Sequence, residues 1–323
     1  MKRIVFAGCS FTHSGDSWAY NARPWIFDHS TKPIPGYNLY TRCEHFGNDF
    51  SKKLVSEQTQ KFIEKYPNHT HLHDLFLVDN YWGSTLDPNE YEINIFGMGS
   101  NSNTNTARAV MHFIENYEHK IDTVVLQISG FARREMVCSD QDAIDKEIKE
   151  RHEHATISKF DDVTFVKQWG SINYEEVMQE TEPSLFRRSS AKFYSTVVEP
   201  EEYHIRAIEQ LQNLTNFCKV NDIKLGYFHG WDNLPKSKDD PDDFTRKTDT
   251  RQYPSRYFTS KYSRYVKPLL LSNKSIIELA EQNLPKELVY DIMDNGNHGG
   301  HPSPIAHKHF WNTIVRPFIV NDK

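Results

Sequence analysis

The sequence predicts an α/β protein whose mainly parallel sheet is covered by helices on both faces. Short apolar runs rich in β-branched and aromatic residues recur along the chain, and segments with helical spacing stand between them. Strands that alternate with helices require crossover connections, which place the helices on the faces of a parallel sheet. The chain of 323 residues is long enough to bury a full core in this arrangement.

Five apolar runs are the expected strands. They are residues 3–8 (RIVFAG), 91–97, 122–129, 223–229 and a weaker run at 287–292. Helical spacing is found at roughly 44–65, 103–119, 202–221 and 303–319. We interpret residues 1–323 as a single domain.

Two segments interrupt this alternation. Residues 136–200 are polar and aromatic, and residues 232–265 are rich in proline and charge. Neither contains a complete set of strands and helices, so we interpret both as insertions carried on the domain. A lid, a contact for homo-oligomerisation and, for the first insertion, a small helical subdomain are the open alternatives.

Composition and charge restrict the function and the compartment. Hydrophobic residues make up 37% and charged residues 25%, as in folded globular proteins. The net charge is -6 and the basic residues are scattered, so we expect no nucleic-acid partner. The apolar run after Arg3 is too short for a signal peptide, and no stretch has the length of a membrane span, so we expect a cytoplasmic protein with no membrane partner. The cysteines form no CxxC pair, which favours free thiols in a reducing compartment; they are Cys9, Cys43, Cys138 and Cys218.

The turn after the first predicted strand is a candidate nucleophile site. In open parallel sheets, ligands bind beyond the carboxyl ends of the strands. Gly8 permits a sharp turn there, and the Ser10 hydroxyl can project from the turn while its backbone N–H donates to an oxyanion. A helix N-cap is the alternative role for Ser10. Ser17, in a Gly-Asp-Ser sequence, is a rival nucleophile, but it lies several residues beyond the strand.

The loop after the second long strand, residues 97–103 (GMGSNSN), concentrates small residues and amides. Such a loop is suited to holding a developing negative charge, although an ordinary turn with an N-cap has the same composition. A dinucleotide-binding loop is less consistent with the sequence, because Ser102 replaces the third glycine of the G-x-G-x-x-G pattern.

His301 is the candidate general base. It precedes Pro302, and Ser303 is the expected N-cap of the last helix, which aims the histidine at the edge of the sheet. Histidine is the usual base for a serine nucleophile. The alternating His69, His71 and His73 have no further ligand nearby, so we expect no metal and no cofactor.

GCSFT at 8–12, GMGSN at 97–101 and HPS at 301–303 occur in the order of the SGNH (GDSL-type) hydrolase blocks. Together with the Arg-Arg-Glu at 133–135, the set resembles the SGNH-like proteins encoded by bacteriophages and some bacteria. The resemblance implies a flavodoxin-like three-layer sandwich with a mainly parallel five-stranded sheet that carries two insertions. If the chain is phage-encoded, the resemblance implies that the protein is located in the host cytoplasm.

The resemblance also implies a serine esterase or acyl hydrolase that cleaves a small ester, such as a carbohydrate O-acetyl group. Ser10 would attack the ester carbonyl, while His301 takes its proton and returns it to the leaving alcohol. The backbone N–H groups of Ser10 and Gly99 would form two arms of the oxyanion hole.

The chain departs from the family pattern at two places. The third strand is followed by Ser129 and a glycine, where the family has an asparagine, and Asn101 is the hypothesised replacement donor. The family's acid partner, three residues before the histidine, is replaced by His298; Asp294, Asp291 or a Ser-His dyad are the alternatives. A noncatalytic SGNH-fold binding or virion-associated protein is therefore the competing hypothesis.

Overall fold

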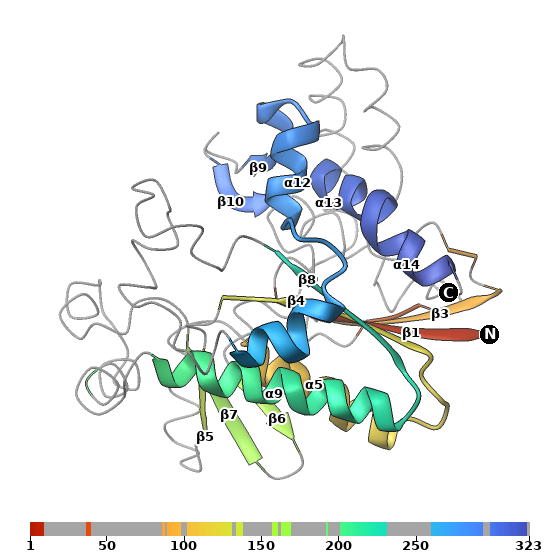
Figure 1. Cartoon of the computed structure of the whole chain (residues 1–323), viewed down its shortest axis with the longest axis vertical. Helices are drawn as coiled ribbons and strands as arrows, with labels where there is room; N and C mark the ends of the chain where they lie inside the picture. The colour runs from red at the N-terminus through yellow and green to blue at the C-terminus, as the bar shows by residue number, and fades with distance from the viewer. Residues whose placement is uncertain are drawn as a thin grey trace, which may run out of the picture.

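The computed structural model describes residues 1–9, 37–39, 86–87, 89–97, 102–130, 134–137, 157–160, 163–168, 192, 201–230, 260–292 and 298–321. Its centre is a parallel sheet with strand order β2-β3-β1-β4-β8 (Figure 1). Four strands are long: β1 (Lys2–Gly8), β3 (Tyr91–Gly97), β4 (Thr123–Ile128) and β8 (Lys224–His229). The three-residue β2 (Tyr37–Leu39) extends the sheet beyond β3. The expected α/β class and parallel sheet are confirmed.

The central strand, β1, pairs with β3 on one side and with β4 on the other. Its side chains alternate between two buried clusters, as expected for a strand covered on both faces. Val5 and Ala7 belong to the cluster on the α5 and α9 side, whereas Ile4 and Phe6 belong to the cluster on the opposite side. The apolar run that predicted the strand is therefore buried because each face meets a different set of helices.

Helices cover both faces of the sheet (Figure 1). One face carries α5 (Asn103–Asn116) and α9 (Glu201–Val220), which contact each other. The other carries α12 (Ile276–Asn283), α13 (Pro304–Phe310), the π-helix η5 (Trp311–Val315) and α14 (Arg316–Val320). No helix in the described ranges is long and apolar enough to cross a membrane.

Serine caps fix the starts of three helices. The Ser102 hydroxyl accepts from the N–H of Asn105 at the start of α5, and Ser275 forms a capping box at the start of α12. Ser303 accepts from the N–H of Ala306 at 3.1 Å, and proline follows it at the first helical position. The expected N-cap at Ser303 is confirmed.

The C-terminal apolar run differs from its prediction. The expected fifth parallel strand at 287–292 is wrong: the 3₁₀ turn η4 (Lys286–Leu288) leads into β9 (Tyr290–Ile292), which pairs antiparallel with β10 (His298–Pro302) in a separate two-stranded sheet. The glycine-rich segment at 298–301 lies within β10. The place beyond β8 is instead taken by Leu270, which forms a parallel bridge with Tyr227.

The described part of the first insertion is a small sheet. Strands β5 (Arg134–Val137), β6 (Ile157–Phe160) and β7 (Val163–Gln168) pair antiparallel in the order β5-β7-β6, and most of the other residues of this insertion lie outside the described ranges. Arg108 of α5 binds Glu135 of β5 at 2.6 Å and ties this sheet to the domain.

In the second insertion, the structure describes the start of the π-helix η2 (Tyr262–Val266), which leads into the 3₁₀ turn η3 (Lys267–Leu269). The expected helix at 44–65 lies outside the described residues.

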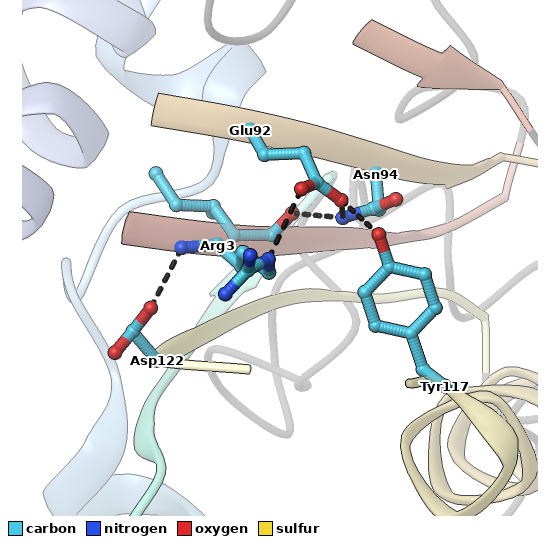
Figure 2. Close-up of polar contacts among 6 residues, drawn as sticks. Arg3, Glu92, Asn94, Tyr117 and Asp122 are labelled. Carbon is cyan, nitrogen blue, oxygen red and sulfur yellow. Dashed lines mark hydrogen bonds and ion pairs between the residues drawn. The ribbon is translucent and has the colours of Figure 1, made fainter. Parts of the chain in front are cut away.

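A polar network ties together the amino ends of the strands (Figure 2). Arg3 donates to the Glu92 carboxylate at 3.1 Å, and Asn94 and Tyr117 donate to the same carboxylate. The backbone N–H of Arg3 donates to Asp122 at 2.7 Å. Since Glu92 and Asn94 are buried, the network compensates for the cost of burying these polar groups.

Candidate functional site

The carboxyl ends of β1, β3, β4 and β8 meet at one edge of the sheet because the four strands are parallel. This is the edge at which open α/β sheets bind ligands. Polar residues stand at this edge: Cys9 directly after β1, Ser129 directly after β4, His229 at the end of β8, and Asn103 at the start of α5, the helix that follows β3. The candidate site is built from these positions.

Cys9, the residue before the predicted nucleophile, is held by a buried glutamine of β4. The backbone N–H of Cys9 donates to Gln127 Oε1 at 3.3 Å, and Gln127 Nε2 lies 3.1 Å from Cys9 Sγ. Both side chains are fully buried. The bond fixes the backbone of the turn directly before Ser10, which itself lies outside the described residues.

Asn103, the first residue of α5, clamps the end of β4. Its Oδ1 accepts from the Ser129 N–H at 2.7 Å and from the Ser129 hydroxyl at 3.2 Å, and its Nδ2 donates to the Ser129 carbonyl at 3.0 Å. The side-chain amide therefore bonds both backbone groups of Ser129, as a neighbouring strand would. Sequence reasoning placed Asn103 in the small-residue loop but missed this contact, because the two residues are 26 positions apart.

His301 lies in β10, three residues before the start of α13. The helical segment that follows it ends at the amino edge, because Lys224, at the start of β8, donates to the Phe318 carbonyl at 2.7 Å and to the Asn321 carbonyl at 3.1 Å. Since this segment spans the sheet against the strand direction, its start lies toward the carboxyl edge. The backbone of His301 therefore lies at the same end of the sheet as the turn after β1.

Aromatic packing fixes that helical segment on the sheet. Phe310 packs against Phe228 of β8 with ring centroids 5.3 Å apart, and Trp311 packs edge-on against Phe6 of β1 at 5.8 Å. All four side chains are fully buried. Such packing leaves the helix little freedom to slide along the strands, so the position of its first turn is well defined.

His229 is a site residue that sequence reasoning missed. It ends β8, is 7% exposed, and its Nε2 lies 2.6 Å from the Tyr262 hydroxyl of η2. Its Nδ1 is buried and has no hydrogen-bond partner within the described part of the chain. Burial lowers the pKa of this imidazole to about 4, so the ring is neutral at neutral pH. The sequence signal that could have identified it is a histidine at the end of an apolar run that predicts a strand.

Most of the predicted catalytic set lies outside the described residues: Ser10, Gly99, Asn101 and Asp294, together with the rival Ser17. The structure brings the predicted strand ends and the start of the last helix to one edge. Of the four cysteines, Cys9 and Cys218 are described; both are buried, and neither forms a disulfide within the described ranges. In the described ranges, no three side chains are grouped as metal ligands.

The carboxyl edge thus combines a turn fixed through Cys9, amide clamps at two strand ends and a neutral buried imidazole. The amides hold the backbone of the edge in place, and His229 Nδ1, which has no hydrogen-bond partner among the described residues, can bond an uncharged polar ligand. Comparison of the chain with protein-family models, with curated proteins and with solved structures gives no match.

Proposed function

We propose that this protein is a serine esterase of the SGNH type that cleaves a small ester. The main support is the shared edge: Ser10 directly follows Cys9, which is anchored at the end of the central strand, and His301 precedes a helix whose first turn lies toward that edge. In this proposal, a nucleophile and a base from distant parts of the chain act at one end of the sheet. The order of the four long strands, β3-β1-β4-β8, is consistent with a flavodoxin-like three-layer sandwich.

The proposed reaction is acyl transfer to Ser10 and then to water. Ser10 Oγ attacks the ester carbonyl carbon and gives its proton to His301. The tetrahedral intermediate collapses, and the leaving alcohol takes the proton from His301. Water, deprotonated by the same histidine, then cleaves the acyl-enzyme and releases the acid. In this proposal the N–H groups of Ser10 and Gly99 and the amide of Asn101 stabilise the oxyanion, and Asp294 orients His301.

A second candidate is a binding protein that keeps the fold without turnover. Two observations favour it. The end of β4 presents Ser129, and its N–H and hydroxyl are both engaged by Asn103, so the family's third oxyanion donor is not replaced there. His298 also stands where the family has its acid partner. Loss of such supports lowers turnover by orders of magnitude in triad enzymes.

Hydrolysis of 4-nitrophenyl acetate separates the two functions. The wild type is expected to hydrolyse it, and Ser10→Ala and His301→Ala each to lose at least about a hundredfold in kcat/KM. Ser17→Ala is the matched control and is expected to keep wild-type activity. The wild type and Ser17→Ala, but not Ser10→Ala, should be labelled by a fluorophosphonate. A wild type without activity or labelling, or a Ser10→Ala variant that retains both, would establish that Ser10 is not the nucleophile of an esterase.

A further inference from the structure

The buried pair of His229 and Tyr262 has an unfilled hydrogen-bonding position. The Nε2 atom of His229 is engaged by the Tyr262 hydroxyl at 2.6 Å, whereas Nδ1 is buried and has no partner among the described residues. A buried polar atom without a partner costs about 1–3 kcal/mol, and native structures retain few of them. A ligand that forms a hydrogen bond with Nδ1 would explain why such an atom lies at a ligand-binding edge.

A second, independent feature of this pair is the backbone of Tyr262. Tyr262 begins η2, a five-residue π-helix, and its side chain is 5% exposed. π-Helical turns are rare and occur frequently at functional sites. Val266, at the other end of η2, is buried in the core cluster that includes Tyr262. The π-helix thus anchors the tyrosine that holds the imidazole in place.

The pair lies on the same edge as the proposed nucleophile. His229 is opposite Ile128 in the β4–β8 ladder, and β4 separates β8 from β1. Two strand spacings put the ends of β1 and β8 roughly 10 Å apart. An ester bound at Ser10 and extending across the end of β4 would therefore bring its alcohol part to His229.

The chemistry of the unfilled position selects the ligand group. Nδ1 of a neutral imidazole is a donor in one tautomer and an acceptor in the other. A hydroxyl group can serve either tautomer, because it donates and accepts. An uncharged ring offers no ion pair to a carboxylate or phosphate, and an apolar alcohol part would leave Nδ1 unpaired.

We propose that His229, held by Tyr262, is a substrate-positioning residue that binds a free hydroxyl group in the alcohol part of the ester. This assignment rests on the proposed esterase function and names its substrate class: esters of polyhydric alcohols. The unfilled Nδ1 gives selectivity, because a site built to hydrogen-bond a hydroxyl rejects the analogue that lacks it.

Nitrogen NMR tests the contact without turnover. Ser10→Ala protein labelled with ¹⁵N-histidine is titrated with glycerol 1-monoacetate or with phenyl acetate, and the His229 signals are assigned by their loss in His229→Leu. The Nδ1 resonance is expected to shift saturably with glycerol monoacetate and to stay unchanged with phenyl acetate. An Nδ1 resonance that moves with neither ester, or equally with both, overturns the proposal.

Kinetics and thermal stability give the second test. In His229→Leu, the ratio of kcat/KM for glycerol monoacetate to that for phenyl acetate is expected to fall at least about tenfold, mainly through KM. His112→Gln, at a partly exposed position of α5, is the control and should leave the ratio unchanged. A purely structural role predicts a lower Tm and an equal loss with both esters, which would contradict the proposal. If the wild type hydrolyses neither ester, the esterase function fails, and the NMR titration still decides the hydroxyl site.

Discussion

Two buried side-chain amides determine the geometry of the carboxyl edge at the level of single residues. Gln127 holds the backbone of Cys9, and Asn103 holds both backbone groups of Ser129. Neither amide was a predicted site residue, although both stand in segments whose secondary structure was predicted. An amide in a strand or at a helix start gives no local sign of its partner, and for Gln127 that partner is 118 positions away.

Removing the Asn103 amide should destabilise the protein. Asn103→Ala leaves the buried N–H and C=O of Ser129 without their partner, so the free energy of unfolding is expected to fall by about 2–3 kcal/mol. Urea denaturation followed by circular dichroism measures this loss. Asn116→Ala, which removes an exposed amide at the other end of α5, is the control and should have a much smaller effect. Equal effects of the two substitutions would show that the Asn103 clamp contributes nothing to the free energy of unfolding.

At the level of the elements, the amino ends of β1 and β3 are joined by an ion pair that is largely shielded from water. The Arg3 and Glu92 side chains are 20% and 8% exposed, and Asn94 and Tyr117 complete the coordination of the carboxylate (Figure 2). The amino edge is thus occupied by structural contacts, whereas the carboxyl edge holds the candidate site. This division is typical of open parallel sheets.

Breaking this network should cost more than breaking a surface pair. Glu92→Leu leaves the Arg3 guanidinium without its carboxylate, and we expect the free energy of unfolding to fall by about 3 kcal/mol. Chemical denaturation provides the measurement. The control is Lys120→Ala, which removes the solvent-exposed pair with Asp222 and is expected to change stability little. If the two variants had the same midpoint, the buried network would be no stronger than a surface contact.

The error at 287–292 also belongs to the element scale. The run is apolar because Leu288 and Val289 are buried, Val289 in the cluster with α12 and the last helices, and not because they enter the main sheet. Burial against helices and burial in a strand require the same side chains. Pairing with β10 could not be foreseen, because the glycines at 299 and 300 favour a loop.

At the scale of the whole molecule, burial keeps the imidazoles of His204 and His229 uncharged in the folded protein at neutral pH. His204 of α9 and His229 of β8 are 8% and 7% exposed. Burial lowers the pKa of each imidazole to about 4 from an unfolded value of 6.5. The unfolded chain therefore binds more protons than the folded protein between these two values, and stability rises with pH in that range.

The protein should lose stability on mild acidification. The contribution of the neutral histidines is fully present above about pH 6.5 and is lost as the pH falls toward 4; by pH 5 about 2 kcal/mol of it has been lost for each histidine. Tm measured from pH 7.5 to pH 4.5 should decrease, and His204→Leu should flatten the decrease. A Tm independent of pH over this interval would show that the two rings are not buried as neutral groups.

The sequence by itself determined the alternation of elements. The four long strands, the helices at 103–116 and 201–220 and the cap at Ser303 follow from apolar runs, helical spacing and one hydroxyl, all of which act over a few residues. It also located the turn after β1 and the segment at His301 as the places to inspect. These features depend on local geometry, which the order of residues fixes directly.

The tertiary structure decided which residues from distant segments contact each other. The antiparallel sheet of the first insertion, the Asn103 clamp and the His229–Tyr262 pair each join segments that are distant in sequence, the last by 33 positions. Whether two such groups meet depends on the packing of every element between them. The energy of one hydrogen bond is too small to determine that packing, so neither residue by itself indicates its partner. The fold class was therefore available from the chain, whereas the contacts of the site emerged only when the elements were packed together.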